Sequence, residues 1–201
     1  MNHERVEKRK SEILSASMDA FAENGYHATK ISDIAERLGI GHGTFYRYFK
    51  NKLDIFSSVL DLIIGELVKV VEEEEPDATN TLEEYRNQIL RIGRRMYTAF
   101  IEDTRMAQII FYEALGVSPD LNEKMNNLMA LNEAGIELYL KNGIAKGFLK
   151  PGLDTAVLAK AINTLMFGGG KDILAAKDPG QMSERWIRSI ALLMLDGMGT
   201  S

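Results

Sequence analysis

TKISDIAERLGIGHGTFYRYFKNK, residues 29–52, is the segment that decides the fold of this chain. The apolar residues of its first part recur at helical spacing: Ile31, Ile34, Ala35 and Leu38. Thr29 is expected to cap this helix, because its hydroxyl can accept a hydrogen bond from a backbone N–H of the first turn. Gly39 is expected to end the helix with a positive φ angle. The pattern predicts a short amphipathic helix followed by a tight turn.

The second part of the segment predicts another short helix whose outer side chains suit DNA. Phe45 and Phe49 are four residues apart and are expected to face inward. The side chains expected to face outward are Thr44, Arg47 and Tyr48, with Tyr46 at the edge. Such groups suit phosphate oxygens and base edges, and small residues at the helix start let backbone N–H groups approach a phosphate. We interpret the segment as a helix-turn-helix; a helical hairpin that binds no nucleic acid is the alternative.

The longer stretch AFAENGYHATKISDIAERLGIGHGTFYRYFKNKLDIF, residues 20–56, resembles the tetracycline-repressor (TetR) family of bacterial transcriptional regulators. The resemblance lies in the Ile-Ala pair, the Gly-Thr-Phe-Tyr-x-Tyr-Phe core and the Asn-Lys start of the next helix. Two residues depart from the family pattern: Leu53 stands where an acidic residue is usual, and His42 where a lysine is common. The remaining three quarters of the chain match the family only in length and helical pattern.

The resemblance and the outward-facing residues together imply a set of DNA contacts. The set consists of Thr29, Lys30, Gly41, His42, Gly43, Thr44, Tyr46, Arg47, Tyr48 and Lys52. Within it, Thr29 is a helix cap first and a phosphate contact second, and Tyr48 has core packing as an alternative. Lys52, at the start of the following helix, is expected to hold a phosphate.

Composition and charge narrow the class of protein. The chain has 201 residues and no cysteine, which excludes a disulfide framework and thiolate chemistry and suits a cytoplasmic location. The net charge is −5, but the part up to Lys52 holds nine basic and seven acidic residues, against 15 basic and 22 acidic residues in the remainder. The positive excess therefore lies with the motif. No apolar run reaches the roughly 18 residues of a membrane span, so no membrane contact is expected.

Helical periodicity continues along the whole chain, and no strand is expected. Besides the motif, helices are predicted over residues 4–24, 51–73, 82–102, 104–115, 119–146, 154–175 and 179–197, with glycine and proline at the breaks. We therefore expect an all-α fold of about nine helices. Residues 1–50 would form a three-helix helix-turn-helix DNA-binding domain, and residues 51–201 an effector-binding and dimerisation domain.

The middle of the chain is rich in methionine and other adaptable apolar side chains, which suit a cavity for a small lipophilic effector. The candidate pocket residues are Met96, Phe100, Ile110, Phe111, Leu115, Met125, Leu128, Met129 and Met166. Ordinary core packing is the alternative for each of them. Arg95 could pair with a ligand carboxylate, and Glu113 could meet a cation.

The last two predicted helices are apolar over unusually wide arcs, which requires more than one partner surface. Their apolar stripes contain Leu158, Ile162, Leu165, Gly169, Trp186, Ile190, Leu193 and Met194. In the resembled family the two corresponding helices build the four-helix bundle of a dimer, so these residues are the expected dimer interface. Burial within one subunit is the alternative.

The residues needed for catalysis are lacking from this sequence. The three histidines lie within the first 42 residues, and neither a Cys-His pair nor a nucleophile elbow is present. Residues 168–171 (GGGK) resemble a phosphate loop only superficially, since Leu165 replaces a required glycine and Asp172 a required Ser or Thr. We interpret them as close helix packing or a kink. The chain is expected to have no catalytic residue, no metal and no cofactor.

These patterns predict a homodimeric, ligand-responsive transcriptional regulator, a repressor that binds a palindromic operator in double-stranded DNA and is released by the effector. A helical small-molecule-binding protein without operator binding is the alternative.

Overall fold

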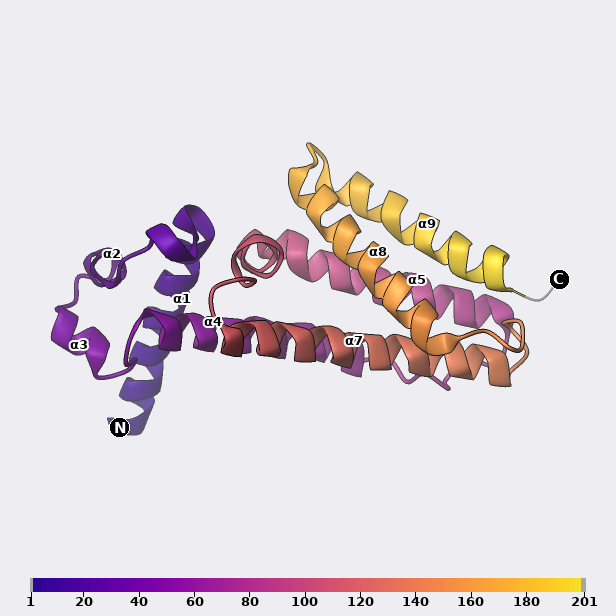
Figure 1. The fold of residues 1–201 in the computed structure, drawn as a ribbon, viewed down its shortest axis with the longest axis horizontal. Coiled ribbons are helices and arrows are strands. Elements are labelled where there is room, and N and C mark those ends of the chain that lie inside the picture. Colours follow the sequence, from indigo (N-terminus) through magenta and orange to yellow (C-terminus); the bar gives the residue numbers. More distant parts are fainter. Residues whose placement is uncertain (1, 200–201) are drawn as a thin grey trace.

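Helices dominate the computed structural model, which describes residues 2–199 apart from the side chains of residues 2, 71 and 72 (Figure 1). They are α1 (Asn2–Ala28), α2 (Ile31–Arg37), α3 (His42–Tyr46), α4 (Lys52–Glu72), α5 (Leu82–Glu102), α6 (Thr104–Gln108), the π-helix η1 (Ile109–Glu113), α7 (Pro119–Ala145), α8 (Thr155–Ala175) and α9 (Pro179–Met198). The predicted all-α class is confirmed, since no strand occurs among the described residues. None of the helices within residues 2–199 combines the length and the apolar character that crossing a bilayer requires.

Two groups of helices follow one another along the molecule and are joined by the long α4 (Figure 1). We call α1–α3 the head and α5 with α7–α9 the body. Helix α4 begins in the head, where it packs on α1, and runs along the body, where it packs on α5 and α7. The short α6 and η1 lie between the two groups and contact α1 on one side and α8 on the other. The predicted domain boundary after residue 50 falls just before α4 and stays a prediction.

The connection between α1 and α2 differs from the predicted cap. Thr29 is only 1% exposed, and its hydroxyl donates to the carbonyl oxygens of Ala20 at 3.0 Å and Gly25 at 2.7 Å. Lys30 occupies the N-cap position of α2, and its N–H donates to the carboxylate of Asp33 at 3.0 Å. The capping prediction for Thr29 was therefore wrong. The reason is the kink at Gly25, with φ 78°, which turns the chain back and buries the hydroxyl against α1.

The head is held on α4 by aromatic packing. Phe45 and Phe49 are buried, as their spacing predicted. Phe21 of α1 meets Phe56 of α4 edge to face, with ring centroids 4.8 Å apart. Each such side chain contributes roughly 1.5–3 kcal/mol when it is fully buried. The turn before α3 contains the predicted positive φ, 61° at Gly39.

The predicted helix over residues 104–115 is divided in two. After α6 the chain forms the π-helix η1, in which the N–H of Ala114 donates to the carbonyl oxygen of Ile109 at 2.9 Å. This hydrogen bond spans five residues instead of the four of an α-helix. Short π-helical turns are rare and often mark functional sites.

Two glycines of residues 168–171 allow close packing of helices, which was one of the two interpretations of this segment; the other was a kink. A Cβ added to Gly169 would lie 2.9 Å from Cδ2 of Trp186, and one added to Gly170 would lie 2.6 Å from Cε2 of Phe111. No side chain fits at either position without displacing a ring. Glycine at positions 169 and 170 therefore lets α8 approach α9 and η1 more closely than any residue with a side chain would permit.

Candidate DNA-binding surface and ligand cavity

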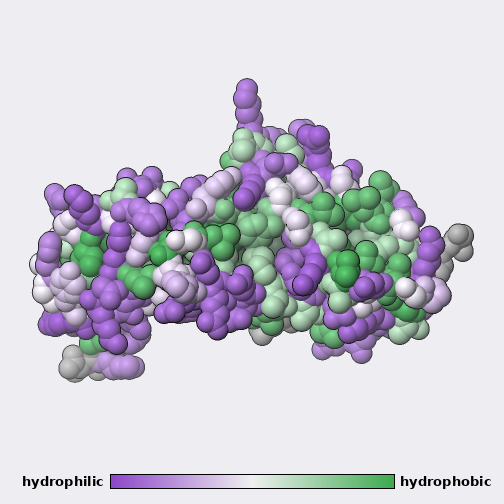
Figure 2. Space-filling model, in the orientation of Figure 1, coloured by the Kyte–Doolittle hydropathy of each residue, from purple (hydrophilic) through white to green (hydrophobic). Residues whose placement is uncertain are grey.

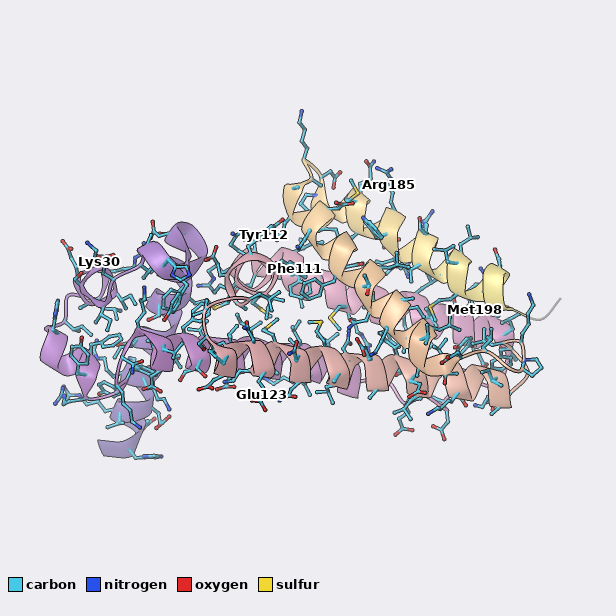
Figure 3. The ribbon with its side chains drawn as sticks, viewed as in Figure 1. Lys30, Phe111, Tyr112, Glu123, Arg185 and Met198 are labelled. Carbon is cyan, nitrogen blue, oxygen red and sulfur yellow. The ribbon has the colours of Figure 1, made fainter. Side chains whose placement is uncertain are left out.

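The predicted DNA contacts of α3 and its turn lie together on the outer end of the head. The exposed members are Lys30, Gly41, His42, Gly43, Tyr46 and Arg47, and Thr44 is half-buried. Figure 3 labels Lys30 at this end of the molecule. Tyr46 is 53% exposed, whereas Tyr48 is half-buried and packs on the hydrophobic core. The prediction that Tyr48 faces outward and Tyr46 lies at the edge was therefore wrong. Tyr46 is the outward ring, because α3 ends at Tyr46 and Tyr48 belongs to the following turn.

Two residues of the predicted DNA-contacting set have different partners in this structure. Thr29 is buried with its hydroxyl bonded to α1, so its side chain is not presented to DNA. The ammonium group of Lys52 donates to the carbonyl oxygens of Tyr26 at 2.7 Å, His27 at 3.2 Å and Thr29 at 3.0 Å. It also lies 4.4 Å from the centre of the Tyr26 ring. The expected phosphate contact of Lys52 is thus replaced by a contact that positions α4 on the end of α1.

A polar cleft beside α3 contains basic residues that the sequence analysis did not assign to DNA. The cleft has a volume of about 690 Å³, and α1 contributes Arg5, Lys8 and Arg9 to its walls. Thr44 and Arg47 line the opposite wall. The positive charge of the first helix therefore adds to the predicted DNA surface. The only signal in the sequence was the basic start of the chain, because the approach of α1 to α3 depends on the packing of the head.

An apolar cavity of about 350 Å³ lies in the body between α4, α5, η1, α7 and α8. Seven of the nine predicted pocket residues line it: Met96, Phe100, Ile110, Phe111, Leu128, Met129 and Met166. The other two were wrong. Leu115 follows η1 and is 57% exposed, and Met125 is buried in the core without lining the cavity. Leu67 and Val68 of α4 also line the cavity and were not predicted, because the apolar stripe of a single helix does not show where that helix meets a cavity.

Polar groups are few in the cavity wall, and they are hydrogen-bonded. The side-chain amide of Asn132 donates to that of Asn163 at 2.6 Å, and Asn163 is buried. The hydroxyl of Tyr97 donates to the carbonyl oxygen of Met166 at 3.1 Å. Burial, with the charge of Glu74 nearby, raises the pKa of Tyr139 to about 12, so this lining residue is neutral at physiological pH. The cavity is therefore uncharged and apolar, with one amide pair as its main polar feature.

Neither charged residue considered for the ligand lines this cavity. The guanidinium of Arg95 lies 3.3 Å from a carboxylate oxygen of Glu73 and 3.4 Å from one of Glu74. A hydrogen bond from Arg91 holds the pKa of Glu74 below its ordinary value. Glu113 accepts a hydrogen bond from the backbone N–H of Tyr26 at 2.8 Å. The two side chains therefore serve contacts within the protein.

An ionic cluster joins α6 to the head. Arg105 contacts the carboxylates of Asp103 and Asp19, each at 2.6 Å. Arg37 of α2 lies 3.8 Å from the same Asp19 and donates two hydrogen bonds to Glu23. Hydrogen bonds from the guanidinium of Arg105 lower the pKa of Asp103. The cluster links the body side of the molecule to both α1 and α2.

The predicted dimer interface lies on two different faces of α8 and α9. Four of its members are buried inside this chain: Ile162, Gly169, Ile190 and Met194. They face α5 and neighbouring helices, so for these four the alternative of burial within one subunit is the correct one. Leu193 is 59% exposed, while Leu158, Leu165 and Trp186 are half-buried. Two further exposed residues, Val157 and Leu192, were not predicted. Figure 2 shows hydrophobic residues gathered over the body and mainly hydrophilic ones on the head.

Comparisons with known proteins agree with this arrangement. The sequence model of the family described as "Bacterial regulatory proteins, tetR family" matches residues 13–59. The chain is 28% identical over 151 residues to the fatty acid metabolism regulator protein of Bacillus subtilis, covering 75% of this chain and 76% of that protein. It is 26% identical over 161 residues to the HTH-type transcriptional activator FasR of Mycolicibacterium smegmatis, covering 75% and 71% of the two chains.

A solved structure is similar over nearly the whole length. The crystal structure of the transcriptional regulator FadR from Bacillus subtilis in complex with stearoyl-CoA has a TM-score of 0.73 and 25% sequence identity, covering 94% of this chain and 98% of that one. The relatives are transcriptional regulators, a class of proteins that are not enzymes.

Proposed function

We propose that this chain, which belongs to the TetR family of bacterial regulatory proteins, is a homodimeric repressor that leaves a palindromic operator when a long-chain acyl compound binds in its body. The chain is a DNA-binding transcriptional regulator with a small-molecule ligand, as its relatives are. The ligand class, the dimer, the operator and the sign of regulation are our proposals. We place the protein in the cytoplasm, where its DNA is.

The exposed end of the head supports the DNA contact. Tyr46, Arg47 and the glycines around His42 combine an aromatic ring, a guanidinium and accessible backbone on one surface. Arg5 and Lys8 of α1 add positive charge beside it, and phosphate contacts of this kind fix a protein on the duplex while base contacts read the sequence. In a twofold dimer, two such surfaces would meet major-groove half-sites about 34 Å apart.

The cavity supports an acyl ligand, and it is the observation on which the proposal mainly rests. Its wall is apolar and rich in methionine, which adapts to flexible chains, and its volume of about 350 Å³ falls in the range of roughly 300–1,000 Å³ usual for ligand sites. Leu131 and Leu138 line it and are exposed on α7, which leaves an opening for a polar head group. The Asn132–Asn163 pair offers hydrogen bonds to a carbonyl in an otherwise apolar site. The similar FadR of Bacillus subtilis was crystallised in complex with stearoyl-CoA.

The outer faces of α8 and α9 support a dimer. Val157, Leu192 and Leu193 are large apolar side chains exposed on two adjacent helices. Contiguous exposed apolar surface on a soluble protein commonly marks an interaction site, and a second copy of the chain would cover it with the same residues.

DNA binding measured by fluorescence anisotropy tests the proposal. The probe is duplex DNA that flanks the protein's own gene, titrated with and without stearoyl-CoA. We expect a saturable complex of two chains per site, lost on addition of stearoyl-CoA. Tyr46→Ala should weaken it about tenfold, which is the order of one base-contacting side chain. Gln181→Ala is the control, because Gln181 is exposed on α9, outside the head and η1. An operator complex that stearoyl-CoA leaves intact would overturn the ligand assignment.

A further inference from the structure

The π-helix η1 is a short turn of helix that touches both the ligand cavity and the head. Ile110 and Phe111 line the cavity. Two residues later, Glu113 accepts the N–H of Tyr26 in α1 at 2.8 Å. In Figure 1 this turn is seen end-on between the head and the body, and Figure 3 labels Phe111 on it. A ligand that moves the cavity wall therefore moves the segment that carries Glu113.

The carboxylate of Glu113 lies at the kink of α1. Gly25 has φ 78° and ψ 162°, outside the helical region, so the regular turn is interrupted just before Tyr26. A Cβ at Gly25 would lie 2.9 Å from Oε2 of Glu113, which means that the carboxylate occupies the space a side chain would need. The hydrogen bond is charge-assisted, since the acceptor is a carboxylate, and such bonds are about twice as strong as neutral ones.

The same kink is where the parts of the head are joined. The carbonyl oxygen of Tyr26 accepts a hydrogen bond from Lys52, the first residue of α4. The ring of Tyr26 lies against Phe21 at 5.9 Å and Phe56 at 4.8 Å. A change in the position of Tyr26 therefore reaches α1, the start of α4 and, through Thr29, the start of α2.

The cavity side of η1 is tightly packed and can only change in discrete steps. The ring of Phe111 meets Phe167 edge to face at 4.6 Å and lies 5.1 Å from Phe100. On its third side the Phe111 ring abuts Gly170 of α8. Because packed interiors switch between alternative packings instead of deforming continuously, a ligand that displaces this ring must shift the turn as a unit.

We propose that η1 couples the two sites: an acyl ligand that displaces Ile110 and Phe111 withdraws Glu113 from the N–H of Tyr26 and releases the head from its DNA-binding position. Glu113 is thus a positioning residue that touches neither ligand nor DNA. The inference rests on the proposed function and adds the route by which that function is regulated.

Affinity measurements on Glu113→Ala separate this role from a merely structural one. Without the carboxylate there is no bond for the ligand to break, so stearoyl-CoA should bind about tenfold more tightly, and the ligand-free protein should bind DNA about tenfold more weakly. Both changes follow from the reciprocity of coupled binding and from the worth of one charge-assisted hydrogen bond. Glu113→Gln keeps an acceptor oxygen and should fall between the wild type and Glu113→Ala. Glu123→Ala, at an exposed carboxylate of α7, is the control and should leave both affinities unchanged.

Several outcomes would overturn the inference. Unchanged affinities in Glu113→Ala would show that the contact is idle, and a parallel loss of both would show a structural role only. A measurement on the wild type avoids any folding defect: amide hydrogen exchange at Tyr26 should become about tenfold faster when stearoyl-CoA is bound, and an unchanged rate would refute the route. If stearoyl-CoA releases wild-type protein from DNA in spite of such results, the proposed function stands and only the coupling through η1 fails.

Discussion

Gly170→Ala is the sharpest test of the packing between α8 and η1. An added Cβ would lie 2.6 Å from Cε2 of Phe111, well inside van der Waals contact, so the ring must move. Phe100 and Phe167 hold the ring on two sides, and the cavity is on another. Overpacking of this kind costs about 1–3 kcal/mol of unfolding free energy.

The helix propensity of alanine works in the opposite direction and must be removed from the measurement. Replacing glycine by alanine inside a helix gains about 1 kcal/mol. Gly65→Ala provides this gain alone, because Gly65 is exposed within α4 and an added Cβ meets nothing within 4 Å. The difference between the two variants therefore isolates the overpacking cost. For a chain of this length, about 1–3 kcal/mol corresponds to a Tm of Gly170→Ala about 2–12 °C below that of Gly65→Ala.

Thermal unfolding of the ligand-free protein, followed by circular dichroism, measures this difference, and a titration with stearoyl-CoA completes the test. A ring that relaxes does so into the cavity, so the affinity for stearoyl-CoA should fall in Gly170→Ala and stay unchanged in Gly65→Ala. If the two variants have equal Tm values and equal affinities, Phe111 is not confined as described, and the argument for a rigid η1 is refuted.

Two further predictions concern the head and its ionic contacts. Lys52→Ala should lower the unfolding free energy by about 1–3 kcal/mol, because the ammonium group donates hydrogen bonds to three carbonyl oxygens. The salt dependence of DNA affinity should stay the same. A decrease of about one in the salt slope would instead show that Lys52 contacts a phosphate. A hydrogen bond from Arg105 lowers the pKa of Asp103 in the folded protein below the ordinary value of 3.8. The carboxylate therefore contributes its full stabilisation above pH 3.8 and loses it as the pH falls through the lowered pKa. The stability difference between the wild type and Asp103→Asn, up to about 1 kcal/mol, should be constant from pH 7 to pH 5 and vanish in stronger acid, as urea titrations at each pH can check.

Local rules accounted for most of the fold. The predicted helix over residues 82–102 coincides with α5, because Thr81 and Glu84 form a capping box at its start, with Glu84 N–H donating to the Thr81 hydroxyl at 3.2 Å. Pro119 and Pro179 begin α7 and α9, at positions where a missing N–H costs nothing. Such signals lie within a few residues of one another, and they can be read without knowledge of the tertiary structure.

The misassigned residues are those whose surroundings come from distant parts of the chain. Thr29 has the sequence character of a cap, but its hydroxyl is bonded to Ala20 because α1 kinks. Met125 and Met129 have the same chemistry and lie four residues apart on α7, yet only Met129 lines the cavity. The π-helical turn likewise has no simple signature in the residues IIFYE, and within it Phe111 packs closely against Gly170 of α8.

The wide apolar arcs of α8 and α9 have a buried side and an exposed side, and the predicted dimer contacts are divided between them. An apolar arc that packs on a single partner is buried only on the side that faces this partner. Ile162 and Ile190 lie on such a side, because the rest of the chain buries them. The same two helices also carry Val157 and Leu192, which the described part of the chain leaves 60% and 56% exposed. Burial within one subunit therefore accounts for the inner side, while the dimer contact of the outer side stays a prediction. Because α8 also supplies Met166 to the cavity, a ligand that shifts α8 would also move its outer face, so we expect ligand binding and the geometry of the proposed dimer to be coupled.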